Sequence, residues 1–322
     1  MPKHPTPFSK GKEGIHMKKN TLVKNLRTEW PLHLFLLPAV ILLLIFSYFP
    51  MVGILIAFQD YVPSKGWDLF FKSEWVGLDN FKYIMSMPGF WTAMRNTLVI
   101  AIQKIAVNIF VPLVLALLLN EVKNALFKKA VQTIVYIPYF FSWVILGGIL
   151  MDILSPTNGI VNQFIELLGG ERINFLGNPD TIQPTFIVTN IWKEVGYNTV
   201  IFLAALTSID PALYEAASVD GAGYFKQMLH ITLPSLLPMI LLVTVLGMGN
   251  ILNAGFDQVF NLYGPVVYET ADIIDTFVYR IGMNELQYSV STAISLFKSV
   301  ISIILIASSF HLAKKYAGYK IF

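Results

Sequence analysis

"YEAASVDGAGYFKQMLHITLP", residues 214–234, separates two long apolar runs of a 322-residue chain. Charged residues, glycine and other small residues alternate closely in this stretch. Around it the chain is 55% hydrophobic and only 13% charged, and its mean hydropathy is +0.61. Soluble domains carry roughly a quarter of charged residues. Because this chain has too little polar surface to cover a water-facing globule, we expect an integral membrane protein in which 214–234 is a polar loop.

Six apolar segments are long enough to cross a bilayer, which requires about 20 helical residues. The sequence therefore predicts an all-α integral membrane fold with six spans. These spans cover residues 33–58, 95–119, 130–151, 184–207, 232–252 and 290–312. Lys104, Lys193, Glu194 and Lys298 fall inside spans. Lipid does not tolerate such charges, so we expect these side chains to face other helices or a cavity.

Lys and Arg residues concentrate on one side of the predicted spans, in the N-terminal tail, the loop that contains the quoted stretch, and the C-terminal end. The three loops on the other side are longer and hold fewer of them. The positive-inside rule then places both termini in the cytoplasm. We expect a cytoplasmic tail over 1–31, a membrane domain over 32–322, and a cytoplasmic loop at about 208–231.

The loop itself reads as two short helices joined by a turn. Asp210 can cap free N–H groups and Pro211 fits the first helical turn, so a helix is predicted to begin there. Glycines from Gly221 onward allow the chain to stop and turn. A second short helix is predicted over 224–230, and Pro234 is predicted to open the next span. The pattern fits an ordinary tight loop as well as a projection that contacts another protein.

The residues that common catalytic sites require are missing. The chain has no cysteine, which excludes disulfides and thiolate metal sites. It contains no GxxxxGK[ST] phosphate loop, no HExxH, no Ser-His-Asp spacing and no paired carboxylates within a span. Basic residues gather at span ends without interleaved aromatics, unlike a nucleic-acid surface. We therefore expect a chain that is not an enzyme and binds no metal, cofactor or nucleic acid.

The quoted stretch resembles the EAA motif of permeases in binding-protein-dependent ABC importers. That motif reads E-A-A, three residues, G, nine residues, I, any residue, L-P, and the chain fills every fixed position. The matching residues, with the "DGA" variant of carbohydrate permeases and the glycine after it, are Glu215, Ala216, Ala217, Asp220, Gly221, Ala222, Gly223, Ile231, Leu233 and Pro234. Residues 192–217 and 249–302 are similar to the polysaccharide-type subfamily of maltose-permease-like proteins, and within it to the larger permease of alginate importers.

The resemblance implies a type I permease in the inner membrane of a bacterium, whose 215–234 loop is a coupling helix that docks into a cytoplasmic ATPase. The implied partners are two ATPase subunits, a second homologous permease and an extracytoplasmic solute-binding protein. ATP and Mg would then bind to the ATPase subunits and not to this chain. The implied cargo is a carbohydrate, an oligo- or polysaccharide such as alginate, carried by alternating access.

Two other functions are possible on the same residues. An ion-gradient-driven secondary sugar transporter commonly shows internal repeats and acidic residues at the bilayer midplane, and neither is evident here. A membrane enzyme of glycan assembly would need a catalytic constellation that the sequence lacks. Neighbouring genes for a solute-binding protein, an ATPase and a second permease would separate the three alternatives.

Polar residues near the ends of the fourth and fifth predicted spans are candidates for the sugar pathway. Carboxamides suit sugar hydroxyls because each offers donors and acceptors. Glycine and asparagine at membrane depth predict irregular backbone beside a cavity. The candidates are Lys193, Glu194, Asn198, Asn250, Asn253, Asp257 and Gln258. Pairing with neighbouring helices and capping of helix ends remain open as other roles for them.

Overall fold

The computed structural model describes residues 19–62 and 72–317, with side chains over 30–62 and 72–311. The part of the predicted cytoplasmic tail before residue 19 lies outside the described residues. Contacts within the chain divide it into two compact units, which separate between Ile54 and Leu55. The boundary predicted between residues 31 and 32 stays a prediction.

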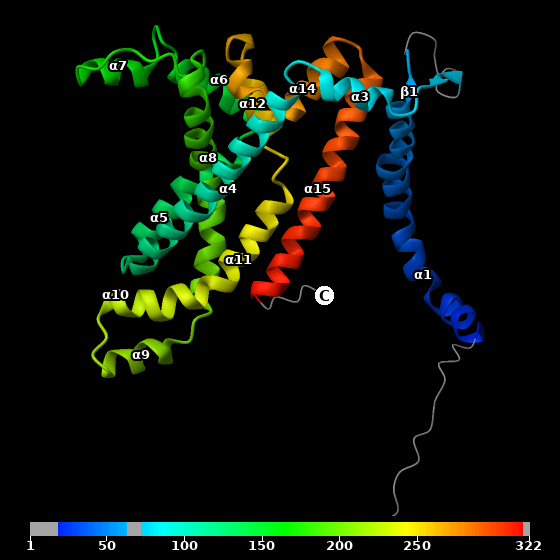
Figure 1. Ribbon diagram of the computed structural model, residues 1–322. Coiled ribbons are helices and arrows are strands. Elements are labelled where there is room, and N and C mark those ends of the chain that lie inside the picture. The colour runs from blue at the N-terminus through cyan, green and yellow to red at the C-terminus, as the bar shows by residue number, and fades with distance from the viewer. Residues whose placement is uncertain (1–18, 63–71, 318–322) are drawn as a thin grey trace, which may run out of the picture. The chain divides into compact units, whose positions relative to one another are not determined.

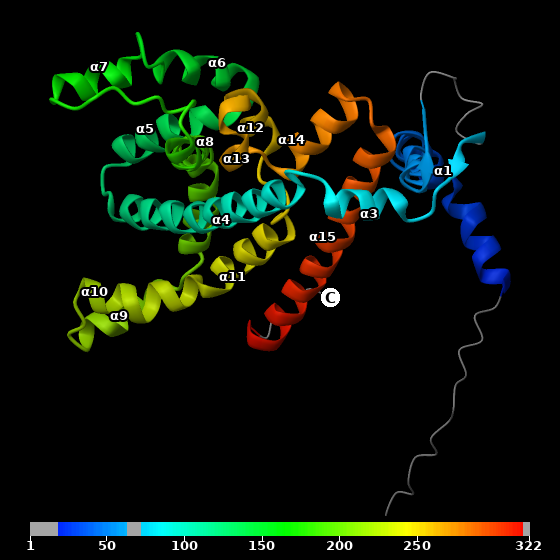
Figure 2. The ribbon, with the colours of Figure 1, turned by 45° about the horizontal axis from the view of Figure 1, so that its top comes forward.

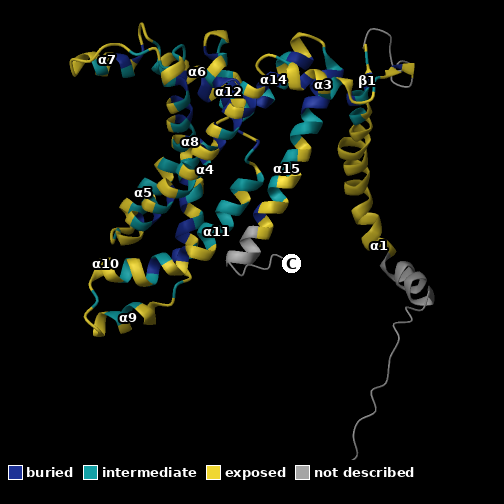
Figure 3. Ribbon diagram, viewed as in Figure 1, coloured by how far each residue is buried: buried dark blue, intermediate teal, exposed yellow. Residues whose placement is uncertain are grey.

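The described part of the first unit is one helical stretch (Figure 1). Helix α1 (Lys19–Leu43) continues into the π turn η1 (Leu44–Tyr48) and the 3₁₀ helix η2 (Phe49–Phe58), which crosses the boundary between the units. Every described side chain from 30 to 52 is exposed, and most are apolar (Figure 3). An apolar surface on all sides of a helix is what lipid would surround. This confirms the span predicted at 33–58, although the helix begins earlier, inside the predicted tail.

Long helices build the second unit (Figures 1 and 2). Helix α4 (Phe90–Glu121) packs along α8 (Pro179–Thr207), and α11 (Leu233–Gly249) packs against α15 (Tyr288–Ala317) and contacts α4 and α8. Within the described residues, four helices are long and apolar enough to cross a membrane, and two bent helix pairs bring the number to six. The six predicted spans therefore correspond to observed helical segments.

The third predicted span keeps its place in the chain but is not one helix. Helix α5 (Ala125–Tyr136) and the 3₁₀ turn η4 (Ile137–Phe140) meet α6 (Trp143–Ile153) at an angle of 104°. Ser142 caps α6 by accepting a hydrogen bond from the Ile145 N–H. The Lys193 ammonium donates to the Tyr139 carbonyl at 2.7 Å and so pairs a backbone group that the break exposes. The expectation of a single helix over 130–151 was wrong for this reason.

Short elements form a layer at the end of the long helices opposite α9 and α10 (Figure 1). The predicted external loops contribute them. They are the antiparallel pair β1 (Gln59–Asp60) and β2 (Glu74–Trp75), α3 (Asp79–Ser86), α7 (Ile160–Leu167), α12 (Phe256–Leu262), η6 (Pro265–Val267), α13 (Tyr268–Ala271), α14 (Ile274–Tyr279) and the π turn η7 (Arg280–Asn284). These elements are covered in part by polar side chains, which suits a surface outside the membrane.

An ion pair organises the segment between α11 and α15. Arg280 donates to the Asp272 carboxylate at 2.5 Å, and its guanidinium lies 4.4 Å from the ring centre of Tyr268. Asn96 on α4 donates to the backbone carbonyls of Glu269 and Asp272 at 3.0 and 3.2 Å. Since these bonds tie the segment to α4, it is a fixed layer and not a free loop.

Apolar clusters hold the long helices together at two levels. Near the end of α8, Phe202 and Leu206 pack with Ala116 of α4 and Leu236 of α11. Such close-packed contacts resist relative movement of the helices. Toward the layer of short elements, a second cluster joins α4, α6, α8, α12 and the segment around Ile273. The stretch of α4, α8 and α11 between these clusters carries the polar residues described next.

Candidate functional site

A helical hairpin over 211–232 follows the end of α8, and we call it the hairpin. Helix α9 (Pro211–Val219) leaves α8 at an angle of 65°. The Asp210 carboxylate accepts a hydrogen bond from the Ala212 N–H at 2.9 Å, which confirms the predicted cap. Gly221 has φ +75°, so the predicted turn needs glycine at this position. Gly223 has φ −71°, an ordinary value, and lies just before the next helix.

The second, returning helix of the hairpin differs from the prediction. Helix α10 (Tyr224–Gln227) passes through the π turn η5 (Met228–Thr232) directly into α11. Pro234 therefore does not open a separate span, and the predicted short helix over 224–230 is the start of one continuous helix. In the π turn the Leu233 N–H bonds the Met228 carbonyl, so the hydrogen-bond register changes just before the residue that lacks an N–H.

Side-chain hydrogen bonds fix the hairpin from inside. The Gln227 amide donates to the Ser218 hydroxyl at 2.9 Å and to the Ala222 carbonyl at 3.0 Å. The hydroxyls of Tyr214 and Thr232 lie 2.9 Å apart. These bonds join the outgoing helix to the returning one. The hairpin is therefore a preformed unit whose outer surface is available for a contact.

The outer surface of the hairpin mixes small, acidic and apolar groups. Leu213, Val219 and Phe225 are 50%, 87% and 72% exposed. Of the motif residues, the exposed ones are Glu215, Ala216, Asp220, Gly221, Gly223 and Pro234, and the half-buried ones are Ala217, Ala222, Ile231 and Leu233. Clustered exposed apolar side chains of this kind mark interaction surfaces. The motif thus has exposed residues that are accessible to another protein and half-buried residues that pack within the hairpin and the start of α11.

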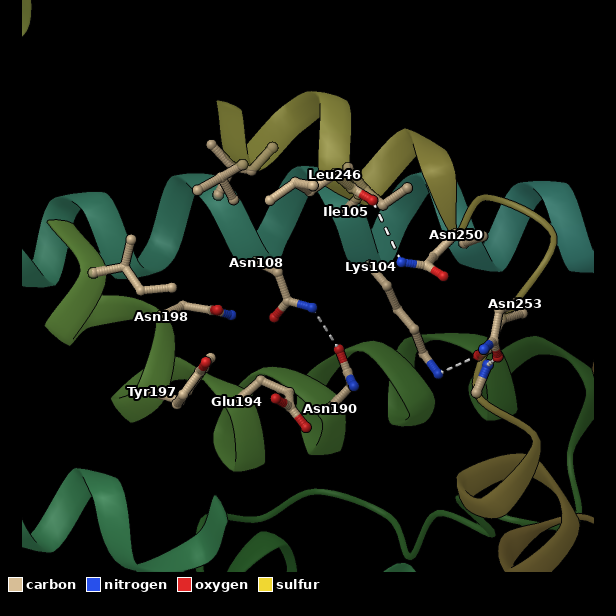
Figure 4. Close-up of a pocket in the computed structure, with 17 residues that line it drawn as sticks. Lys104, Ile105, Asn108, Asn190, Glu194, Tyr197, Asn198, Leu246, Asn250 and Asn253 are labelled. Atoms are coloured by element: carbon tan, nitrogen blue, oxygen red, sulfur yellow. Dashed lines mark hydrogen bonds between the residues drawn. The ribbon is translucent and has the colours of Figure 1, made fainter. Parts of the chain in front are cut away.

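A second site is a cavity of about 510 Å³ between α4, α8 and the end of α11 (Figure 4). Volumes of this size are typical of small-molecule sites. Its polar lining consists mainly of side-chain amides. They belong to Asn108, Asn190, Asn198, Asn250 and Asn253, and Lys104, Glu194 and Tyr197 also line it. Ile105 and Leu246 add apolar wall. We call this space the polar cavity.

Two amides face each other across the polar cavity. Asn108 of α4 donates to the Asn190 side-chain oxygen of α8 at 3.0 Å (Figure 4). Among the described residues, the Asn108 side-chain oxygen has no hydrogen-bond partner although it is buried. Leaving a buried acceptor unpaired costs about 1–3 kcal/mol. A ligand that donates a hydroxyl hydrogen would remove that cost.

Lys104 closes the end of the polar cavity that lies next to α12. Its ammonium, in a side chain only 7% exposed, donates to the Ala254 carbonyl at 2.6 Å and also bonds the Gln258 side-chain oxygen. The Gln258 amide in turn donates to the Phe186 carbonyl and the Thr189 hydroxyl, both at 2.8 Å. This network pins the break after α11 to α4 and α8. Irregular backbone at this depth requires such partners.

Glycine is required where the break meets Lys104. Gly255 has φ +92°, and a Cβ added there would lie 2.9 Å from the Lys104 ammonium nitrogen. The backbone conformation disfavours any larger residue, and a Cβ would also displace the Lys104 ammonium from its present position. The sequence signal for irregular backbone at 249–258 is therefore confirmed by the described geometry.

The predicted pathway residues separate into two groups. Glu194, Asn198, Asn250 and Asn253 line the polar cavity, whereas Lys193, Asp257 and Gln258 do not. Lys193 instead pairs the Tyr139 carbonyl at the break before α6 and lies 3.9 Å from Glu194. Gln258 is buried behind Lys104, and Asp257 is exposed at the start of α12.

Sequence reasoning missed three polar lining residues, Asn108, Asn190 and Tyr197, whereas Lys104 was expected to face other helices or a cavity and lines this one. Their spacing held the signal. Lys104 and Asn108 are four residues apart on α4, and Asn190, Glu194 and Tyr197 follow a spacing of four and three on α8. Residues at these intervals share one helix face. Polar residues that repeat along one face of an apolar span therefore indicate its cavity side.

Comparisons with known proteins identify what the chain is similar to. Residues 81–318 match the family described as binding-protein-dependent transport system inner membrane component. The polygalacturonan/rhamnogalacturonan transport system permease protein YteP of Bacillus subtilis (strain 168) is 45% identical over 299 residues, 93% of this chain and 92% of that protein. Protein LplB of the same organism is 45% identical over 290 residues, 90% of each chain.

Solved structures agree with these relatives. A crystal structure of a bacterial ABC transporter involved in the import of the acidic polysaccharide alginate contains a chain with a TM-score of 0.84 and 38% identity. The match covers 92% of this chain and 99% of that one. A crystal structure of the bacterial alginate ABC transporter in complex with an alginate pentasaccharide-bound periplasmic protein gives a TM-score of 0.83, also at 38% identity.

Proposed function

The chain belongs to the family of binding-protein-dependent transport system inner membrane components and is a permease of an ABC importer, and we propose that its cargo is an oligosaccharide derived from an acidic polysaccharide. The family assignment sets aside the ion-gradient-driven alternative. One similar protein is named for polygalacturonan and rhamnogalacturonan, and two similar structures are titled for alginate. All three names point to polymers that contain sugar acids.

The observation that carries the proposal is the chemistry of the polar cavity. Five carboxamides line it, and the buried oxygen of Asn108 lacks a donor among the described residues. A sugar hydroxyl both donates and accepts, so it can complete such a lining. Lys104 places a cation at one end, which favours a carboxylate of the cargo. Glu194 opposes that preference and has Lys193 at 3.9 Å as a partial counter-charge.

The hairpin is proposed as the coupling helix that docks into an ATPase subunit. Its exposed apolar residues and its exposed Glu215 and Asp220 support a protein partner that contacts both kinds of group. Two ATPase subunits, which would bind ATP and Mg, and a second homologous permease are proposed as partners. A solute-binding protein would deliver the sugar to the layer of short elements at the opposite end, and the transporter would act by alternating access. With the inner membrane as its location, both termini are proposed to be cytoplasmic.

Reconstitution tests the cargo. The permease, its partner subunits and its solute-binding protein would be placed in proteoliposomes, and uptake of an acidic oligosaccharide such as oligogalacturonate would be compared with a neutral one of equal length. Asn108→Ala should lower uptake of the acidic sugar about two- to tenfold at saturating binding protein, from the loss of one or two hydrogen bonds. Asn174→Ala, which removes an exposed amide outside the cavity, is the matched control. Uptake of the neutral sugar alone would contradict the proposed cargo.

A further inference from the structure

A second hollow, of about 530 Å³, lies among α12, α14 and α15 on the side of the layer of short elements. We call it the outer hollow. Its lining combines three aromatic side chains, an ion pair and small polar groups. The residues that the argument uses are Asn253, Phe256, Asp275, Tyr279 and Lys298. Neither the role proposed for the polar cavity nor the role proposed for the hairpin accounts for this combination of residues.

The outer hollow and the polar cavity meet at one residue. Asn253 lines both spaces, at the break between α11 and α12. It is exposed, and its side-chain oxygen accepts only the Gly255 N–H among the described residues, at 3.3 Å. The amide N–H groups of Asn253 are therefore available to a ligand that extends from one space into the other.

The rings of the outer hollow offer flat apolar surface. Phe256 and Tyr279 line it, with their ring centres 5.7 Å apart and their planes tilted by 51°. Phe260, one turn beyond Phe256 on α12, stacks on Phe256 at 5.2 Å but does not line the hollow. Phe260 thus packs against both Phe256 and Tyr279. Aromatic rings held in this way present the C–H face of a pyranose with a rigid apolar partner at low cost in conformational entropy.

The ion pair of the outer hollow offers donors and acceptors side by side. Lys298 of α15 bonds one carboxylate oxygen of Asp275 on α14, and both side chains are about a fifth to a quarter exposed. The other oxygen of Asp275 has no hydrogen bond among the described residues, and an ammonium has three donors. Neighbouring hydroxyls of a sugar, one donating and one accepting, match a carboxylate beside an ammonium.

From these features we propose that the outer hollow is a second sugar subsite, continuous with the polar cavity through Asn253, so that the permease holds an extended oligosaccharide across both spaces. Each space alone falls within the range of a small-ligand site, and together they exceed what one sugar residue fills. The inference rests on the proposed function, since it assigns a chain length to the same cargo. It predicts that long and short sugars depend on different residues.

A chain-length series tests the outer subsite. Uptake of an acidic disaccharide and of an acidic pentasaccharide would be measured in the reconstituted transporter with loaded binding protein saturating. Phe256→Ala should lower pentasaccharide uptake about three- to tenfold, as expected for the loss of one ring contact. Disaccharide uptake should change less than twofold. Phe110→Ala, which removes an exposed ring of α4 that lines neither space, should leave both rates within twofold of the parent.

Tyr279→Leu provides a second variant, because it keeps most of the side-chain volume and removes the ring from the hollow. It should reproduce the selective loss for the pentasaccharide. Equal losses for both sugars, with reduced assembly of the two permeases, would show that the hollow is a subunit contact and overturn the inference. Unchanged pentasaccharide uptake in both variants would also overturn it. If the parent transporter carries no acidic sugar of either length, the proposed cargo is wrong as well as the inference. That result is distinguishable from the other two, because in both of them the parent transporter still carries acidic sugar.

Discussion

The buried network around Lys104 leads to a prediction that the parent and three variants can decide. Gln258 is fully buried and holds Lys104 through its oxygen while its amide donates to Phe186 and Thr189. Gln258→Leu keeps the approximate volume but removes all three bonds. Lys104 then retains only the Ala254 carbonyl as a partner for its charge. We expect this single substitution to be more damaging than Lys104→Met, which removes the charge together with its need for partners.

The magnitudes follow from the bonds that each variant loses. A hydrogen bond to a charged group contributes about 1.5–3 kcal/mol, and each neutral bond about 0.5–1.5 kcal/mol. Gln258→Leu should therefore cost about 2–5 kcal/mol, since the Thr189 hydroxyl keeps its bond to Thr185 at 2.6 Å and the Phe186 carbonyl lies in a helix. Lys104→Met leaves two acceptors unpaired, but it also removes an ammonium whose insertion costs about 2.5–3.5 kcal/mol. Its net cost is expected to be smaller.

A double-mutant cycle measures the coupling. The parent, both single variants and the double variant would be purified as assembled transporters, and the midpoint of thermal unfolding of each would be read from intrinsic fluorescence. Because the charge is absent in the Lys104→Met background, Gln258→Leu should lower the midpoint less there than in the parent. Additive shifts, which are expected of distant and independent sites, would refute the network. A lower midpoint for Lys104→Met than for Gln258→Leu would refute the desolvation argument.

Three further predictions concern the hairpin and the break before α6. Gly221→Val, at φ +75° and with open space around it, should leave insertion and assembly intact while transport-coupled ATP hydrolysis falls; normal stimulated hydrolysis would contradict the coupling role. Ser218→Cys should resist an impermeant thiol reagent in sealed cells whereas Asn178→Cys reacts, and labelling of the former would invert the orientation. Lys193→Met unpairs the Tyr139 carbonyl and should lower the unfolding midpoint of the assembled transporter. Because it also removes the partial counter-charge of Glu194, uptake of an acidic sugar should fall more than uptake of a neutral one.

Much of the fold could be predicted because bilayer thickness fixes the length of apolar runs. The spans near 95–119, 184–207 and 290–312 all lie within observed helices. The start and the turn of the hairpin were predictable for a local reason. An Asp-Pro pair determines its start, and a glycine with positive φ determines its turn. Both effects depend only on residues that are neighbours in the sequence.

The break before α6 was predictable only in part from local sequence, through Pro138 and the capping Ser142. Residues 137–142 continue an apolar run, and the pattern alone is compatible with one helix across the membrane. The freed carbonyl of Tyr139 is satisfied by Lys193, 54 residues further along the chain. Gly196 adds to this, because a Cβ there would lie 2.4 Å from the Val135 carbonyl oxygen. Tertiary partners of this kind leave no trace at the break itself.

The polar cavity was predictable in part, and the reason lies in which helix faces meet. The residues found in advance, Glu194, Asn198, Asn250 and Asn253, were conspicuous as polar groups near span ends. Asn108 lies in mid-span and acquires its role only through Asn190, which is 82 residues away. A sequence shows the face that each residue occupies, but the pairing of two faces is set by packing. Periodicity can therefore nominate lining residues without saying which ones converge.

The hairpin and the polar cavity are mechanically joined, which supports the proposed coupling. Helix α8 enters the hairpin and α11 leaves it, and the same two helices carry Asn198 and Asn250 into the cavity. From Asn198 to the end of α8 is about 13 Å at 1.5 Å per residue. Over that length the cluster around Phe202 and Leu236 ties α8 to α11 and α4. A close-packed cluster is displaced as a body more easily than it is sheared, so a shift of the hairpin would move two walls of the cavity together.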